Sequence, residues 1–120
     1  MSDVTIEELV DRLGAVAILD VRTEREYDGT GGQACDPRQG HIPGARHLDL
    51  YRMFELTPDE VRAAVGLPAG AEVIAYCHSG GRSAMAAQVL GSLGYNARNY
   101  VGSWHEWSRH DDLPIEIVTG

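Results

Sequence analysis

The sequence lacks lysine, so all ten of its basic residues are arginine. It has only two cysteines, Cys35 and Cys77, too few for the multi-disulfide framework of small secreted domains. No apolar run approaches the ~20 residues of a membrane-spanning helix. Residues 1–8 include three acidic side chains and lack the apolar stretch of a signal peptide. These absences favour a soluble, cytoplasmic protein in a reducing compartment, with no membrane partner.

The charge balance is also one-sided. Eighteen acidic residues against ten arginines give a formal net charge of -8, which disfavours nucleic acid because phosphate backbones attract basic proteins. Hydrophobic residues make up 43% of the 120 positions, an ordinary fraction for a globular chain. Length and composition therefore predict one folded domain over residues 1–120.

Apolar periodicity and helix-capping signals predict alternating strands and helices. Two of these signals are capping boxes, one from Thr5 to Glu8 and one from Thr57 to Glu60. The predicted strands cover residues 16–21, 46–48, 73–76 and 97–100. The predicted helices cover residues 5–13, 24–27, 50–54, 57–65 and 83–93, with a last short helix from residue 103. Segments 28–39 and 111–120 are predicted to be a loop and a tail. This order predicts an α/β fold with a mainly parallel central sheet and helices on both faces, whose ligands bind at the carboxyl ends of the strands.

Cys77 lies at such a strand end, directly before a glycine-rich turn. Gly80 and Gly81 allow positive φ angles, so that consecutive backbone N–H groups can converge on an anion. Ser83 is predicted to cap the helix that follows, whose dipole, together with the Arg82 charge, favours a thiolate. We therefore expect the pKa of Cys77 to lie below its ordinary value.

A thiolate in such a loop suits attack on a phosphate ester or on a sulfane sulfur. Cysteine-based phosphatases have five residues between the cysteine and the arginine of the loop, whereas four residues separate Cys77 from Arg82 here. A shorter loop makes a smaller cradle. It favours a single sulfur atom over a tetrahedral phosphate.

Four motifs, in order, resemble those of the rhodanese-like sulfurtransferase family. They are Leu19-Asp20-Val21-Arg22 with Glu26-Tyr27, Gly40-His41-Ile42-Pro43-Gly44-Ala45, the Tyr76–Ser83 loop, and Gly102-Ser103-Trp104 with Trp107. The resemblance covers nearly the whole chain. It implies the three-layer α/β/α rhodanese fold and sulfane-sulfur transfer through a Cys77 persulfide. Thiosulfate would be the donor, cyanide or a thiol the acceptor, and no cofactor would be needed.

The resemblance leaves two rival functions. One is a sulfur-relay or binding module that exchanges sulfur with a partner protein through the same loop. The other, disfavoured by the loop count, is a cysteine-dependent phosphatase or arsenate reductase.

Other residues receive more specific expectations. Arg82 is expected to recognise the donor anion, and His78 to line the mouth of the site. The remaining loop residues are expected to bind substrate: Ser79, Gly80, Gly81 and Ser83. Asp20, Arg22 and His41 are expected to support the surrounding loops through ion pairs and hydrogen bonds.

The loop at 28–39 is longer than the family's usual spacing. It could cover part of the active site, but a neutral surface insertion is favoured, because loops tolerate added residues at little cost. Cys35, His41 and His47 are spaced six residues apart and contain none of the usual short metal-ligand pairs. We therefore predict no metal site. Cys35 could resolve the Cys77 persulfide or form a disulfide with Cys77, but an uninvolved loop thiol is favoured.

Overall fold

Five parallel strands form one sheet in the order β1-β5-β4-β2-β3 in the computed structural model, which describes residues 3–118. The strands are β1 (Asp3–Val4), β2 (Ala17–Asp20), β3 (Arg46–His47), β4 (Glu72–Tyr76) and β5 (Asn96–Tyr100). The helices are α1 (Ile6–Asp11), α2 (Glu24–Asp28), α3 (Leu50–Glu55), α4 (Pro58–Val65), α5 (Gly81–Ser92) and α6 (Ser103–Trp107). The parallel α/β fold predicted from the sequence is confirmed.

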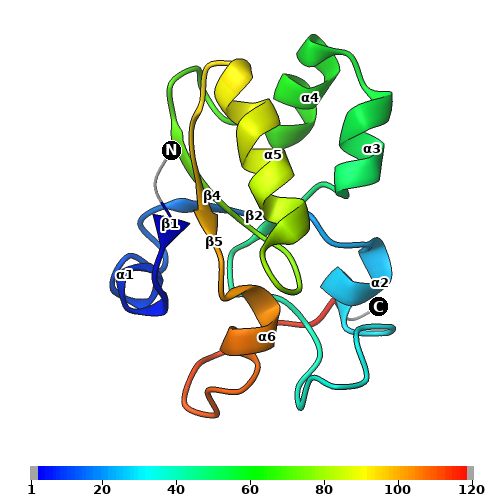
Figure 1. Cartoon of the computed structure of the whole chain (residues 1–120), viewed down its shortest axis with the longest axis vertical. Coiled ribbons are helices and arrows are strands. Elements are labelled where there is room, and N and C mark those ends of the chain that lie inside the picture. The colour runs from blue at the N-terminus through cyan, green and yellow to red at the C-terminus, as the bar shows by residue number, and fades with distance from the viewer. Residues whose placement is uncertain (1–2, 119–120) are drawn as a thin grey trace.

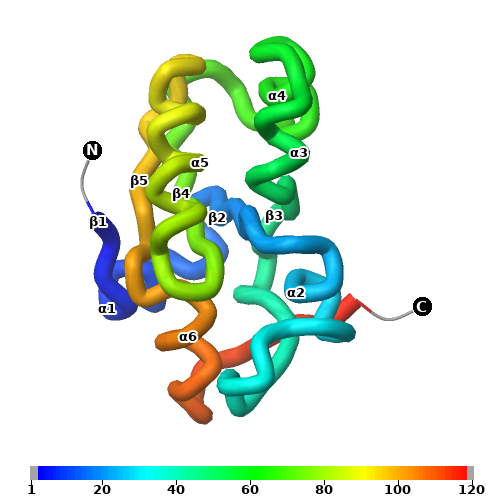
Figure 2. Tube along the Cα trace, turned by 45° about the vertical axis from the view of Figure 1, so that its right-hand side comes forward, coloured from blue at the N-terminus to red at the C-terminus, as the bar shows by residue number. Residues whose placement is uncertain are grey.

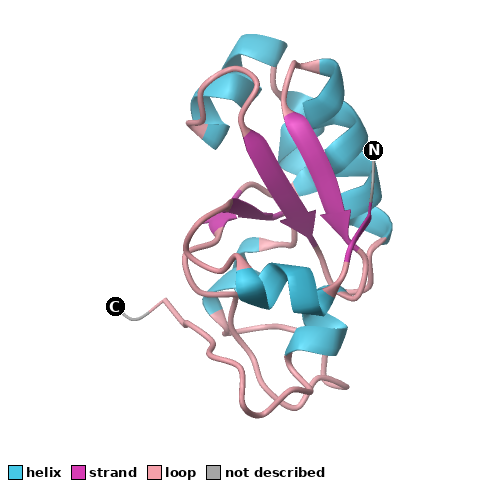
Figure 3. Cartoon of the chain, turned by 90° about the vertical axis from the view of Figure 1, so that its left-hand side faces the viewer, coloured by secondary structure: helices cyan, strands magenta, loops and turns pink. Residues whose placement is uncertain are grey.

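Two hydrophobic clusters lie on opposite faces of the sheet. One joins the inward sides of α3, α4 and α5 to residues such as Val73 and Ala75 of β4. The other joins α1 and α6 to Ile74 and Tyr76 of the same strand. Side chains of a strand alternate between faces, so β4 is apolar on both. Figure 1 shows α5 beside β4 and β5, and Figure 3 shows this long helix along one side of the same two strands.

Most predicted element boundaries hold within two residues, and three details differ. Strand β1, which pairs with β5 through Asp3 and Val4, was not predicted. Helix α5 begins at Gly81 rather than Ser83, with Gly80 at its N-cap. Thr5 caps α1, but the Glu8 carboxylate forms ion pairs with Arg12 and Arg98 instead of completing the predicted capping box. The second predicted capping box, at α4, is present.

The segment after α2 is ordered against the C-terminal part of the chain. The Arg38 guanidinium donates hydrogen bonds to the carbonyls of Trp107, Ser108, His110 and Leu113. In Figure 2 the cyan segment that contains Arg38 runs beside α6 and beside the red segment near the C-terminus. Within the predicted tail, Glu116 pairs with His41 in a short antiparallel bridge, while residues 119 and 120 lie outside the described range.

No helix among residues 3–118 combines the length and the apolar character that crossing a membrane requires.

Candidate active site

Cys77 follows β4 directly and is almost fully buried, with 1% of its surface exposed. Its Sγ accepts a hydrogen bond from the backbone N–H of Gly80 at 3.1 Å. It accepts a second from the Ser83 hydroxyl at 3.4 Å. Ser83 therefore serves the sulfur directly instead of capping α5, which corrects the role predicted for its side chain.

These contacts change the acidity of the thiol. Burial by itself raises the pKa of Cys77, because it removes water from the thiolate. The Ser83 hydroxyl and the backbone N–H groups of Ser83, Ser79 and Gly80 act in the opposite direction, and the net pKa lies below the ordinary value. A buried sulfur with several convergent hydrogen-bond donors suits the thiolate form of the cysteine.

Gly80 gives the loop its tight turn. Its φ is 97°, in the left-handed region, and a Cβ at this position would lie 2.7 Å from the carbonyl oxygen of Val101. The buried Asn99 donates from Nδ2 to the Gly80 carbonyl at 3.2 Å and holds this peptide in place. Gly81 is instead the first residue of α5, so the positive φ predicted for it is wrong.

Helix α6 holds the loop from the other side. Ser103 Oγ accepts from the Cys77 backbone N–H at 3.1 Å and donates to the Tyr100 carbonyl at 2.8 Å. The backbone N–H groups of Trp104 and His105 donate to the carbonyls of Cys77 and His78, both at 2.9 Å. The start of α6 therefore fixes the peptides on both sides of the Cys77–His78 bond. The sequence singled out Ser103 only as part of a motif.

Arg82 is paired with a carboxylate of the protein. Its guanidinium donates to both oxygens of Glu26, at 2.9 and 3.1 Å, and Glu26 is only 4% exposed. The ion pair links the first turn of α5 to α2. Arg82 remains close enough to Cys77 for their charges to interact, but much of its charge is offset by Glu26.

Asp20 and Arg22 form a buried ion pair behind the site. Arg22 donates to Asp20 Oδ2 at 2.7 Å and to the Gly40 carbonyl at 2.6 Å. The Tyr76 hydroxyl donates to the same Asp20 oxygen at 2.6 Å and accepts from the Ile42 backbone N–H at 3.0 Å. This network ties the second motif to the ends of β2 and β4.

The two histidines near the second motif serve neighbouring loops. The His41 Nδ1 lies 2.8 Å from the Tyr27 carbonyl oxygen, and its ring stacks on Tyr27. His47 also stacks on Tyr27, and its Nε2 lies 2.7 Å from the Arg22 carbonyl oxygen. Neither histidine belongs to the cluster of potential metal ligands around Cys35.

The long loop at residues 28–39 contacts the active-site loop, Tyr76–Ser83. Cys35 Sγ lies 3.8 Å from His78 Nε2, and an Asp36 carboxylate oxygen lies 3.1 Å from the same nitrogen. His78 follows Cys77 directly, and 20% of its side-chain surface is exposed. The segment thus packs at the mouth of the site, which favours the alternative that it covers part of it.

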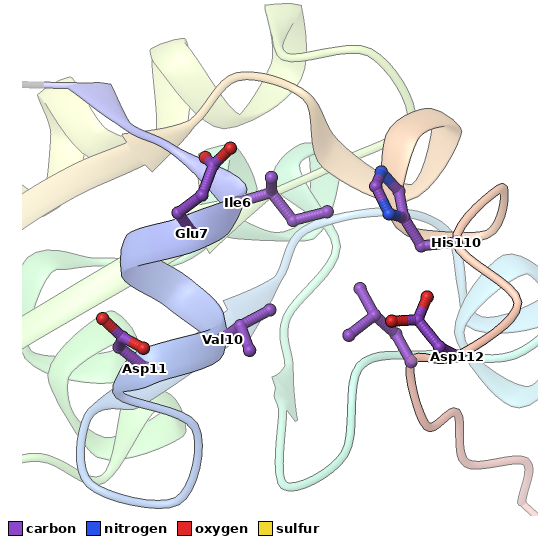
Figure 4. Close-up of a pocket in the computed structure, with 7 residues that line it drawn as sticks. Ile6, Glu7, Val10, Asp11, His110 and Asp112 are labelled. Carbon is purple, nitrogen blue, oxygen red and sulfur yellow. The ribbon is translucent and has the colours of Figure 1, made fainter.

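A separate pocket lies between α1 and residues 110–113. In Figure 4, Ile6 and Val10 face His110 and Asp112 across it. Its lining includes the carboxylates of Glu7, Asp11 and Asp112 and no residue of the Cys77 loop. Since three carboxylates repel an anion, the pocket does not suit an anionic sulfur donor.

Comparison with known proteins gives the same assignment as the four motifs. The Rhodanese-like domain family matches residues 5–110. A thiosulfate sulfurtransferase of Pseudomonas aeruginosa is 37% identical over 124 residues, covering 94% of this chain and 45% of that protein. The sulfur carrier protein TtuD of Thermus thermophilus is 32% identical, covering 85% of this chain and 41% of that protein.

A solved structure is also similar. The crystal structure of a probable thiosulfate sulfurtransferase superposes with a TM-score of 0.81 at 43% identity, covering 95% of this chain and 47% of that one. The chain therefore spans about half the length of the relatives it matches. With the fold, the motif order and the family match in agreement, this chain belongs to the rhodanese-like domain family.

Proposed function

We propose that the chain is a sulfurtransferase in which Cys77 carries a sulfane sulfur as a persulfide. The observation that carries the proposal is the set of donors around Cys77 Sγ, which lowers the pKa of a buried thiol. The names of the relatives support thiosulfate as the donor.

The reaction would run as two displacements. The Cys77 thiolate attacks the outer sulfur of thiosulfate and forms a new S–S bond, while the original S–S bond breaks and sulfite leaves with its electron pair. An acceptor such as cyanide then attacks the outer sulfur of the persulfide. Thiocyanate forms, the Cys77 thiolate is regenerated, and no external oxidant or reductant is consumed.

The loop would act by electrostatic stabilisation. The N–H groups of Ser79, Gly80 and Ser83 and the Ser83 hydroxyl offer more donors than one sulfur needs, so the outer persulfide sulfur can share them. Arg82 would contribute to binding the anionic donor while Glu26 fixes its orientation. The expected result of Arg82→Ala is therefore a higher KM for thiosulfate.

Steady-state kinetics test the proposal. Double displacement predicts parallel lines in double-reciprocal plots with thiosulfate and cyanide, and complete loss of turnover in Cys77→Ser. Retained turnover in Cys77→Ser would overturn it. Cys35→Ser is the matched control, because it removes the other thiol, which is exposed.

A protein persulfide relay is the second candidate, suggested by the similarity to the sulfur carrier protein TtuD. It predicts that a protein persulfide is preferred over thiosulfate as the sulfur donor at equal concentration. The four-residue spacing disfavours a phosphatase, so we expect no hydrolysis of an aryl phosphate.

A further inference from the structure

Four potential metal ligands meet where the long loop touches the active-site loop. Their donor atoms all lie within 4.8 Å of one another. They come from three separate segments: Cys35 and Asp36 from the loop, His78 from the residue after Cys77, and His105 from α6. Their wide separation in sequence explains why spacing alone did not indicate a site.

The distances approach those of a tetrahedral metal site. Bond lengths of about 2.0–2.3 Å to Zn²⁺ put neighbouring ligand atoms roughly 3.3–3.7 Å apart. Here His78 Nε2 lies 3.1 Å from Asp36 Oδ2 and 3.8 Å from Cys35 Sγ. His105 Nδ1 lies 3.6 Å from Asp36 Oδ1. Small side-chain rotations would bring these atoms around one ion.

Asp36 carries an independent sign of a missing ligand. Its side chain is fully buried, and Oδ2 has no hydrogen-bond donor among the described residues. His78 Nε2 is close to Oδ2 but satisfies hydrogen-bond geometry only toward Oδ1. A buried carboxylate oxygen without a donor is costly, and a cation between Oδ2 and the imidazole nitrogen would remove that cost.

Arg109 organises the ligands from outside the cluster. It donates to Asp36 Oδ1 at 2.9 Å and to the Cys35 carbonyl at 2.7 Å. It therefore orients the carboxylate while leaving Oδ2 available. Such outer hydrogen bonds to ligating carboxylates are a regular feature of metal sites.

We propose that Cys35, Asp36, His78 and His105 bind a divalent transition-metal ion, with Zn²⁺ the best match. One thiolate, two imidazoles and one carboxylate suit Zn²⁺ or Co²⁺, whereas Mg²⁺ and Ca²⁺ prefer sites made of oxygen atoms alone. Cys35 and His105 are exposed, so an ion can enter from solvent. The ion would join the long loop, α6 and the residue beside Cys77.

Cobalt substitution tests the site in the Cys77→Ser variant of this chain, where Cys35 is the sole thiol. After chelator treatment, added Co²⁺ should give the strong visible bands of a tetrahedral ion and a thiolate-to-cobalt band in the near ultraviolet. Zn²⁺ should abolish both and protect Cys35 from alkylation. Absence of the bands, or alkylation unaffected by Zn²⁺, would overturn the proposal.

Two further variants locate the ligands. In the same background, Cys35→Ser should lose the near-ultraviolet band, and His105→Ala should weaken Co²⁺ binding by more than about 100-fold, above the loss typical of an outer-shell change. His110→Ala is the matched control, because His110 lies outside the cluster and should leave the spectrum unchanged. Unaltered binding in both ligand variants, with circular dichroism confirming the fold, would contradict the assignment.

Discussion

At the scale of single residues, the acidity of Cys77 depends on a few donors. Burial opposes the charged form, so the hydrogen bonds from the loop must more than offset it. Most of these donors are backbone N–H groups fixed by the turn at Gly80, and only Ser83 contributes a side chain. That hydroxyl can be removed without changing the backbone.

Ser83→Ala should raise the pKa of Cys77. A hydrogen bond to a charged group contributes about 1.5–3 kcal/mol, which corresponds to roughly 1–2 pH units. The pH dependence of Cys77 alkylation, measured in a Cys35→Ser background, gives this pKa. Ser79→Ala is the control, since it keeps the backbone N–H that serves the sulfur. An unchanged pKa in Ser83→Ala would show that the hydroxyl does not stabilise the thiolate.

Gly80 and Gly81 should respond oppositely to alanine. Gly80→Ala forces a Cβ against the Val101 carbonyl in a left-handed backbone, so unfolding free energy should fall by about 1–3 kcal/mol. Gly81→Ala places a Cβ in open space on a helix and should be neutral or stabilise by up to about 1 kcal/mol. Urea denaturation measures both. Equal losses of unfolding free energy in the two variants would contradict the left-handed turn at Gly80.

At the scale of elements, the site forms where β4, α5 and α6 meet. β4 ends at Cys77, the start of α5 supplies donors, and the start of α6 binds the loop carbonyls. Ser103 links α6 to this arrangement and has a φ of 57°, unusual for a residue other than glycine. Its two buried hydrogen bonds offset the strain of that conformation.

Ser103→Ala should destabilise the protein by about 1–3 kcal/mol, because the Cys77 N–H and the Tyr100 carbonyl lose their partner inside the core. Sulfur transfer should also slow as the loop loosens. Thermal denaturation and turnover can be compared with Ser92→Ala, an exposed serine on α5. A loss no larger than in Ser92→Ala would contradict the bracing role.

The sequence predicted these elements better than their contacts. The capping box at Thr57 and the apolar run before Cys77 have strong local signals, and both predictions are confirmed. The two-residue strand β1 has no periodicity to detect and depends on pairing with β5. Similarly, the partners of Arg82 and Ser83 are set by tertiary packing. Spacing alone could not show that Arg82 pairs with Glu26, or that the Ser83 hydroxyl donates to the Cys77 sulfur.

At the scale of the whole molecule, ion pairs connect distant segments. The partly buried ion pair between Glu26 and Arg82 joins α2 to α5, and the buried pair of Asp20 and Arg22 joins β2 to the second motif. Burial raises the pKa of Glu26, but hydrogen bonds from Arg82 and Thr23 outweigh it and lower that pKa to about 2. The folded state therefore binds protons at Glu26 less readily than the unfolded chain.

Glu26→Gln should remove an acid-sensitive part of the stability. With pKa values of about 2 folded and about 4.3 unfolded, the Glu26 contribution is complete above about pH 4.3 and is lost as pH falls toward 2. The difference in unfolding free energy between the wild type and Glu26→Gln should then decrease by on the order of 3 kcal/mol as the pH falls across this window. Urea denaturation at several pH values measures it, with the exposed Glu24→Gln as control. A pH-independent difference would contradict the low pKa.

Intact-mass spectrometry after incubation with thiosulfate shows whether Cys77 carries the transferred sulfur. A Cys77 persulfide should appear as a gain equal to one sulfur atom in the wild type and in Cys35→Ser, reversed by cyanide and absent in Cys77→Ala. A sulfur adduct that persists in Cys77→Ala, or no adduct in the folded wild type, would contradict it.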